Sequence, residues 1–236
     1  MALLAGSLLA ADSTPKDDVK AAAKKLANNY SWKSTVENGA GAGGGGRRGG
    51  FGGGPSEGKT AGGTTWVSRT MGGNSIETVI QGTNGAVKTA DNGWQSLKEL
   101  SQDDGGGGFN PGMFMARMIQ TFKAPAVEAA DLADSTKELK KDGDVYSGDL
   151  TEAGAKSLLT FGPPRGGGDG PEISGAKGSV KFWVKDGVLT KYEVKVQGTI
   201  SFNGNDRDVN RTTTIDISNA GSTKVEVPED AKKKLS

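Results

Sequence analysis

The stretch that decides the fold is Gly178–Phe202, which reads GSVKFWVKDGVLTKYEVKVQGTISF. Nine apolar side chains occupy even positions, whereas lysine, glutamate, threonine and serine fill most of the odd ones. This alternation is typical of a β-strand with one buried face and one face in water. Asp186-Gly187 interrupts it, and this dipeptide favours the type I′ turn of a tight hairpin. We therefore predict a long antiparallel hairpin whose apolar face the rest of the chain must cover.

Two apolar residues, Trp183 and Leu189, break the alternation and fall on the odd face. A tryptophan on the outer face of a strand needs a packing partner of its own. The nearest candidate is a short terminal helix expected at 228–235. We therefore expect Trp183 to contact that helix.

The composition excludes several kinds of site. The 236 residues contain no cysteine and no histidine, which removes thiolate and imidazole metal sites, haem ligation and His-dependent triads. The 29 basic and 28 acidic residues give a net charge of +1, so nothing in the overall charge favours a nucleic-acid partner. We expect no metal, no cofactor and no nucleic acid.

The N-terminus contains a short apolar run, Leu3–Ala11, followed by polar sequence from Asp12. The run is too short to cross a bilayer, and it resembles the end of a secretory signal with small residues before the cleavage point. Ser7 stands where a lipoprotein would carry its lipidated cysteine. We predict that 1–11 is a signal-like remnant, with a disordered tail as the alternative. The signal-like interpretation implies an exported protein that is periplasmic or associated with the membrane surface.

Hydrophobic periodicity predicts the other elements. Helices are expected at 15–29, 111–122, 125–139 and 151–161, each with an apolar stripe or a recognisable start signal. Strands are expected at 30–37, 64–71, 74–81, 86–89, 145–150, 211–218 and 223–227.

The 39 glycines are clustered rather than periodic, and they mark three loops at 38–54, 103–108 and 162–170. The first loop contains Arg47-Arg48, but a single arginine-glycine copy in a neutral chain favours a plain loop over an RNA-binding tract. Asn203–Asp208 is polar yet lacks the spacing of a calcium loop, so we expect a solvated hairpin loop there.

The order of elements predicts an α+β fold. Strands before and after a central helical block, all joined by turns, indicate a large antiparallel sheet. A sheet of that size curls. We predict an unclosed half-barrel whose concave face is covered by the helices at 15–29, 111–122 and 125–139, with 12–236 forming a single domain.

Ala176–Phe202, with its tryptophan, Asp-Gly turn and Lys-Tyr-Glu strand, resembles the LolA-like fold of exported lipid-handling proteins. That group contains the outer-membrane lipoprotein carrier and the LppX-type lipoproteins. The closing strands with Val227-Pro228-Glu229, and the helical interruption before them, add to the resemblance. The glycine tracts depart from the group's pattern. The resemblance implies an apolar space between sheet and helices that binds acyl chains.

We therefore predict a non-enzymatic exported protein that carries or senses a lipid or another apolar ligand. Each methylene group that such a cleft buries contributes about 0.8 kcal/mol, so binding needs no polar chemistry. The side chains that such a cleft would use are Trp32, Trp66, Phe114, Met115, Met118, Phe122, Phe182 and Tyr192.

Two alternatives remain open at this stage. The same aromatic residues can fill a dry core, and the protein would then be a cell-envelope structural or interaction module with a protein partner. An enzyme would have to use the close carboxylate pairs Asp149 with Glu152 or Asp142 with Asp144. Both pairs fall at turns or caps, where acids serve local hydrogen bonds. We therefore expect no catalytic residues.

Overall fold

The computed structural model describes residues 13–39, 55–71, 73–89, 91–102, 110–160, 171–202 and 204–235. The signal-like segment at 1–11 lies outside the described residues. So do Arg47-Arg48, the glycine loops at 103–108 and 162–170, and nearly all of the loop at 38–54. Among the described residues, none of the helices has both the length and the apolarity needed to cross a membrane.

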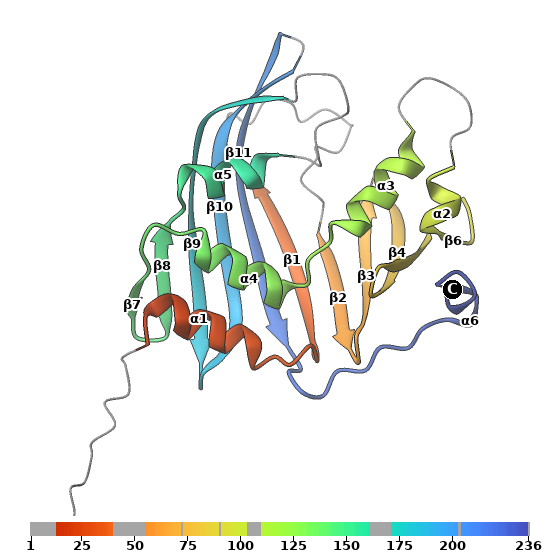
Figure 1. Cartoon of the computed structure of the whole chain (residues 1–236), viewed down its shortest axis with the longest axis horizontal. Coiled ribbons are helices and arrows are strands. Elements are labelled where there is room, and N and C mark those ends of the chain that lie inside the picture. The colour runs from red at the N-terminus through yellow and green to blue at the C-terminus, as the bar shows by residue number, and fades with distance from the viewer. Residues whose placement is uncertain are drawn as a thin grey trace, which may run out of the picture.

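The described strands form one antiparallel sheet of 11 strands. Its order is β6-β5-β4-β3-β2-β1-β11-β10-β9-β8-β7, so two sequential meanders meet where β1 pairs with β11. The outer strands β6 and β7 do not pair with each other, which leaves the curled sheet unclosed, as predicted (Figure 1). The strands are β1 (Tyr30–Asn38), β2 (Ser56–Ala61), β3 (Thr64–Met71), β4 (Asn74–Gln81), β5 (Asn84–Lys88), β6 (Trp94–Ser96), β7 (Lys140–Asp142), β8 (Val145–Asp149), β9 (Glu172–Lys185), β10 (Val188–Phe202) and β11 (Asn205–Ser218).

The predicted hairpin is β9–β10. Asp186 and Gly187 both have positive φ, at 54° and 71°, as a type I′ turn requires. Phe182 lies opposite Tyr192 in the register, and both are buried, so the even-numbered face points into the core. Alternation in the sequence thus identified two of the three longest strands of the sheet.

Five helices lie on the concave face, and the predicted α+β class is confirmed. Figure 1 shows α1, α4 and α5 in front of β8–β11 and α3 in front of β3 and β4. The main core lies under α1, α4 and α5, and a smaller core of Val87, Leu100, Ala116 and Ile119 lies under α2 and α3. The helices are α1 (Pro15–Lys24), α2 (Leu97–Leu100), α3 (Pro111–Gln120), α4 (Pro125–Asp134), α5 (Glu152–Leu159) and α6 (Glu229–Lys232).

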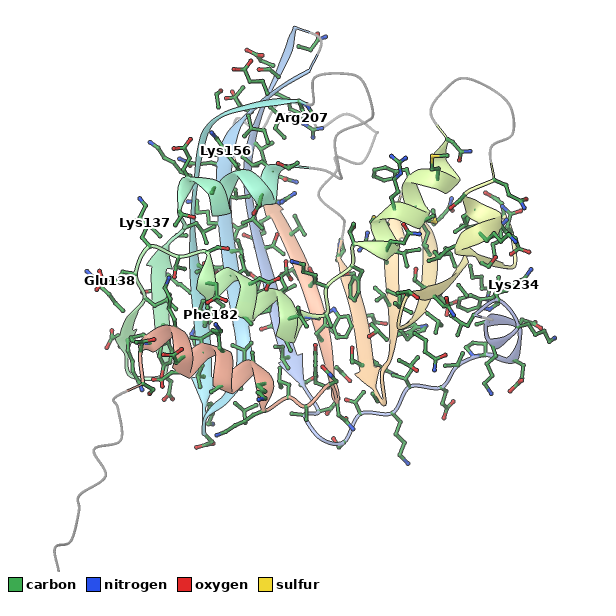
Figure 2. The ribbon with its side chains drawn as sticks, in the orientation of Figure 1. Lys137, Glu138, Lys156, Phe182, Arg207 and Lys234 are labelled. Atoms are coloured by element: carbon green, nitrogen blue, oxygen red, sulfur yellow. The ribbon has the colours of Figure 1, made fainter. Side chains whose placement is uncertain are left out.

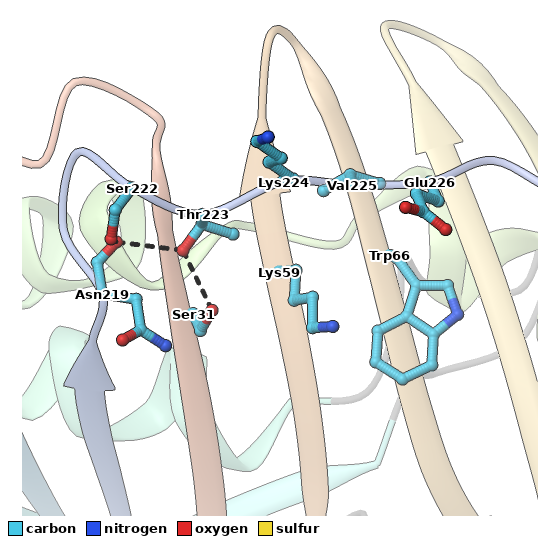
Figure 3. Close-up of a pocket in the computed structure, with 9 residues that line it drawn as sticks. All are labelled: Ser31, Lys59, Trp66, Asn219, Ser222, Thr223, Lys224, Val225 and Glu226. Carbon is cyan, nitrogen blue, oxygen red and sulfur yellow. Dashed lines mark hydrogen bonds between the residues drawn. The ribbon is translucent and has the colours of Figure 1, made fainter.

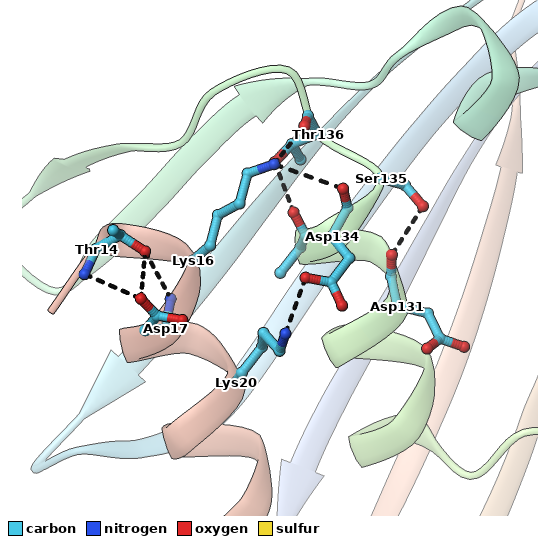
Figure 4. Close-up of polar contacts among 9 residues, drawn as sticks. Thr14, Lys16, Asp17, Lys20, Asp131, Asp134, Ser135 and Thr136 are labelled. Atoms are coloured by element: carbon cyan, nitrogen blue, oxygen red, sulfur yellow. Dashed lines mark hydrogen bonds and ion pairs between the residues drawn. The ribbon is translucent and has the colours of Figure 1, made fainter.

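Helices α1 and α4 lie side by side and are joined by polar contacts (Figure 4). Lys20 forms an ion pair with Asp134 at 3.0 Å, and Lys16 Nζ donates to the carbonyl of Thr136 at 2.6 Å. Thr14 begins α1 with a capping box, accepting from the backbone N–H of Asp17. Exposed ion pairs contribute little to stability, so these contacts mainly orient the two helices over the sheet.

The C-terminal segment crosses the opposite, convex face; we call residues 219–235 the C-terminal strap. The strap starts at the end of β11, and its last residues, Ala231 and Leu235, pack with Val79 and Ala86 on the convex side of β4 and β5. Asn84 Nδ2 donates to the carbonyl of Leu235 at 2.6 Å. The strap therefore forms a partial second layer on the face that lacks α1–α5.

The strap corrects two predictions. Residues 223–227 do not form a strand, because Val227 packs against the convex face instead of pairing at a sheet edge. Trp183 does not meet the terminal helix, which contacts β5 and β6 at the other end of the sheet. The Nζ of Lys191 lies 5.0 Å from the Trp183 ring centre instead, in a cation–π contact on the outer face.

Three local predictions also differ from the structure. Strand β2 was not predicted, because Ser56–Ala61 contains no large apolar side chain. The polar stretch after β10 is not a loop: Asn205 pairs with Phe202, so the hairpin continues almost to its tip. Trp94 begins β6, which was not among the predicted strands.

Candidate functional site

The concave face is closed at one end, under α1 and α4. Phe182 and Tyr192 are 0% and 1% exposed, and their rings lie 6.3 Å apart. Figure 2 shows Phe182 between the sheet and these helices. The hydroxyl of Tyr192 donates to Glu128 Oε2 at 2.5 Å, and the hydroxyl of Tyr30 accepts from the N–H of Ala126 at 3.0 Å. This end is a packed core anchored to α4 by two tyrosine hydroxyls.

Glu128 makes this end sensitive to pH. Burial raises the pKa of its carboxyl from the ordinary value of 4.5, although the hydrogen bond from Tyr192 acts in the opposite direction. At pH values between 4.5 and the raised pKa of Glu128, the folded state binds more protons than the unfolded chain. The free energy of unfolding therefore falls as pH rises through this window.

We predict that Glu128→Gln removes this fall and makes the protein more stable than the wild type at pH 8. Denaturant unfolding across the acid-to-neutral range measures the slope. Asp131→Asn is the matched control, since Asp131 lies on the same helix and forms an exposed ion pair with Lys123. A wild-type slope that persists in Glu128→Gln would show that another group causes it.

The middle of the concave face carries an aromatic stack. Trp32 on β1 stacks on Phe122, which lies between α3 and α4, with ring centres 6.3 Å apart and planes 25° apart. Trp32 is buried, whereas Phe122 is half-buried and packs at the margin of the main core. The stack therefore marks the boundary between the closed end and the part of the face under α3.

The predicted side chains of α3 are not fully buried. Phe114, Met115 and Met118 are all half-buried, and Met115 packs against the smaller core. Arg69 Nη1 on β3 lies 3.1 Å from Met118 Sδ. Methionine side chains adapt to irregular apolar partners, so the contact between α3 and the sheet is the adjustable part of the concave side.

Trp66 is the one predicted cleft residue that the structure places elsewhere. It lies opposite Val79 in the register and packs with the convex-face cluster of Val79, Ala86 and Ala231. Its indole Nε1 donates to Glu77 Oε2 at 3.3 Å. The other seven predicted residues belong to elements on the concave side, where Trp32, Phe182 and Tyr192 are buried and the other four are half-buried.

A pocket of about 560 Å³ lies on the convex face, under the C-terminal strap (Figure 3). Its wall includes Trp66, with Lys59 Nζ 5.7 Å from the ring centre. The Thr223 hydroxyl lies 3.0 Å from that of Ser31 and donates to the carbonyl of Asn219. Polar groups dominate the lining, which is the opposite of what an acyl chain needs. The lining residues are Ser31, Lys59, Trp66, Asn219, Ser222, Thr223, Lys224, Val225 and Glu226.

Two arginines on the concave face were not singled out from the sequence. Arg69 on β3 and Arg211 on β11 are half-buried, and within the described residues neither has a carboxylate at ion-pair distance. Burial lowers the pKa of both guanidinium groups. Both occupy inward positions of their strands, two residues from Val67 and four from Ile215. The sequence of β11 alternates and could have indicated an inward cation at Arg211, whereas the sequence of β3 does not alternate and gave no such signal for Arg69.

The carboxylate pairs considered for catalysis lie at the start of a helix and at a turn. Glu152 forms an i,i+4 ion pair with Lys156 at 2.7 Å, at the start of α5. Asp142 and Asp144 flank the turn between β7 and β8. In the described part of the chain, no three acidic side chains are grouped so that they could hold a metal ion. We assign no catalytic or metal site.

No protein-family model matches the chain, and no curated protein matches it. Among solved structures, it is similar to the "crystal structure of bifunctional dehydratase-cyclase domain in ambruticin biosynthesis". That similarity covers 91% of this chain and 81% of the other at 12% identity, with a TM-score of 0.19. A TM-score this low carries no argument about fold or activity.

Proposed function

We propose that the protein is a non-enzymatic, exported binding protein of the LolA-like type that carries or senses a lipid or another apolar ligand on its concave face. One observation supports the proposal most: the aromatic and methionine side chains under α3 are half-buried, while those under α1 and α4 are packed solid. The ligand would lie beside the Trp32–Phe122 stack and displace α3 slightly.

The energetics favour an apolar ligand for this place. Half-buried side chains such as Phe114 and Phe122 still expose apolar surface, and covering it contributes about 25 cal/mol for each Å² removed from water. Helix α3 is followed by the linker 121–124 and contacts mainly β5 and α2, so it can move without disturbing the main core. Export is supported by the apolar run at 3–11 and by the resemblance of 176–202.

Native mass spectrometry after mild extraction tests the proposal, together with uptake of a fluorescent fatty acid by the purified chain. We expect a bound lipid mass and saturable uptake. Phe114→Glu should lower the affinity by about tenfold or more, because it places a charge in the apolar contact. The control Val127→Glu, at an exposed position of α4, should bind like the wild type. A clean apo mass without uptake would contradict the proposal.

The second candidate is a cell-envelope structural or interaction module with no ligand. The burial of Phe182 and Tyr192 favours it, since these side chains fill one part of the concave side with the protein's own residues. It predicts that cross-linking in cells captures one envelope protein and that extraction yields no lipid. The same pair of experiments therefore separates the two candidates.

A further inference from the structure

The concave face carries positive charge that the described residues do not neutralise. Among the described residues, the polar contact of the Arg69 side chain is with the thioether sulfur of Met118, a weak acceptor with no charge. A half-buried guanidinium normally has a carboxylate partner, because removing the charge from water is costly. Arg69 therefore retains hydrogen-bond donors and a charge that a ligand could satisfy.

Arg211 adds a second, partly satisfied cation on the same face. Its Nη2 donates to the carbonyl of Leu158 in the last turn of α5 at 3.2 Å, which is a favourable place for a cation. Its buried Nε has no hydrogen-bond partner among the described residues. The carboxylate of Glu128 partly offsets the charge of Arg211, whereas no acidic group in the described part of the chain does so for Arg69. Arg69 is thus the less compensated of the two.

Three of the neighbours of Arg69 are apolar, and a fourth, Ser56, lies opposite it on β2. Val67 lies on the same face of β3, Met118 contacts the guanidinium from α3, and Ile76 lies opposite in the register. A cation bordered by apolar side chains suits a molecule with an acidic head and a hydrocarbon tail. Carboxylate and phosphate groups share this chemistry, since each accepts two parallel N–H donors from one guanidinium.

We infer that the ligand of the concave face is an anionic amphiphile whose acidic head group binds Arg69 while its hydrocarbon chain lies under α3. This inference rests on the proposed function. The inference specifies that the head group carries a negative charge and that Arg69 binds this group. Arg211 contributes less, because it already bonds to Leu158 and lies near Glu128.

Isothermal titration of the full chain with four dodecyl amphiphiles, below their micelle concentrations, tests the inference. The probes are laurate, dodecyl phosphate, 1-dodecanol and dodecyltrimethylammonium. We expect laurate or dodecyl phosphate to bind about tenfold or more tightly than dodecanol, as a charge-assisted hydrogen bond provides. Dodecyltrimethylammonium should bind most weakly. The stronger of the two anionic probes identifies the head group as carboxylate or phosphate.

Arg69→Gln should remove the preference for the anionic probes, and Arg211→Gln should reduce it by a smaller factor. Arg117→Gln, which deletes one exposed positive charge from α3, is the matched control and should leave the preference unchanged. If Arg69→Gln fails to fold, Arg69→Lys is used instead. This variant keeps the positive charge but loses the paired N–H donors of the guanidinium, so it should weaken laurate binding. Circular dichroism verifies the fold of each variant.

The outcomes separate the inference from the proposed function. Equal binding of laurate and dodecanol by the wild type overturns the inference and leaves lipid binding standing. A larger loss in Arg211→Gln than in Arg69→Gln overturns the assignment of the head group to Arg69. No binding of any dodecyl probe overturns the inference together with the proposed function.

Discussion

Replacing Phe182 with alanine should lower the free energy of unfolding by about 3–5 kcal/mol. Phe182 is fully buried in the main core, and its ring packs against Tyr192, whose hydroxyl is bonded to Glu128 on α4. Its truncation leaves a cavity that strands β9 and β10 cannot close, because they are held in register on both sides. Chemical denaturation followed by circular dichroism measures the change.

Val127→Ala is the matched control for this experiment. Val127 is 48% exposed on α4, so its truncation should change the free energy of unfolding by about 0.5 kcal/mol or less. A loss below about 1 kcal/mol in Phe182→Ala would show that the region under α1 and α4 collapses easily or already contains space. That result would place the ligand at this end of the concave face instead of under α3.

Much of the sheet was predictable because alternation leaves a direct trace in sequence. β9 and β10 alternate over many residues, and Tyr30, Trp32 and Val36 repeat the pattern in β1. Their burial follows the predicted faces. Val19, Ala22 and Ala23 form an apolar stripe in the sequence, and all three are buried in α1. In each case one periodic face meets one core, and the local pattern contains the information.

The remaining features depend on contacts between distant segments. The alternation of Val225 and Val227 reads as a strand, yet the strap meets its partners, Val79 and Ala86, by packing across the sheet. Trp66 was assigned to the concave cleft because its residue type suited that role, whereas the register places it on the convex face. Nothing near Trp66 in sequence indicates which face the strap covers.

The candidate site shows the same limit. The sequence identified the side chains of the aromatic stack and of α3, but not which of them would be packed solid. That difference depends on where α1 and α4 end, since Tyr192 and Phe182 lie beneath them while Phe122 lies beyond. The sequence did not indicate a role for Arg69, because its strand, Thr64–Met71, mixes polar and apolar residues without alternation. Its significance appears only when the inward face is known.

Gly58→Ala should lower the free energy of unfolding by about 1–3 kcal/mol, the usual cost of adding a methyl group to a packed site. Gly58 lies opposite Trp32 in the register of β2 and β1, and the indole ring covers it. A Cβ atom at Gly58 would lie within 2.5 Å of atom Cε2 of that ring. The ring must therefore move, and Phe122, which stacks on it, must move as well.

Tryptophan fluorescence and denaturant unfolding measure this effect, with Gly93→Ala as the control. A Cβ atom at Gly93 meets nothing within 4 Å, so that variant should be neutral or slightly stabilised. The two outcomes of Gly58→Ala bear on function as well as stability. A lipid that lies beside the Trp32–Phe122 stack should bind more weakly once the stack is displaced. Unchanged lipid affinity in a variant with an altered tryptophan signal would place the ligand away from the stack.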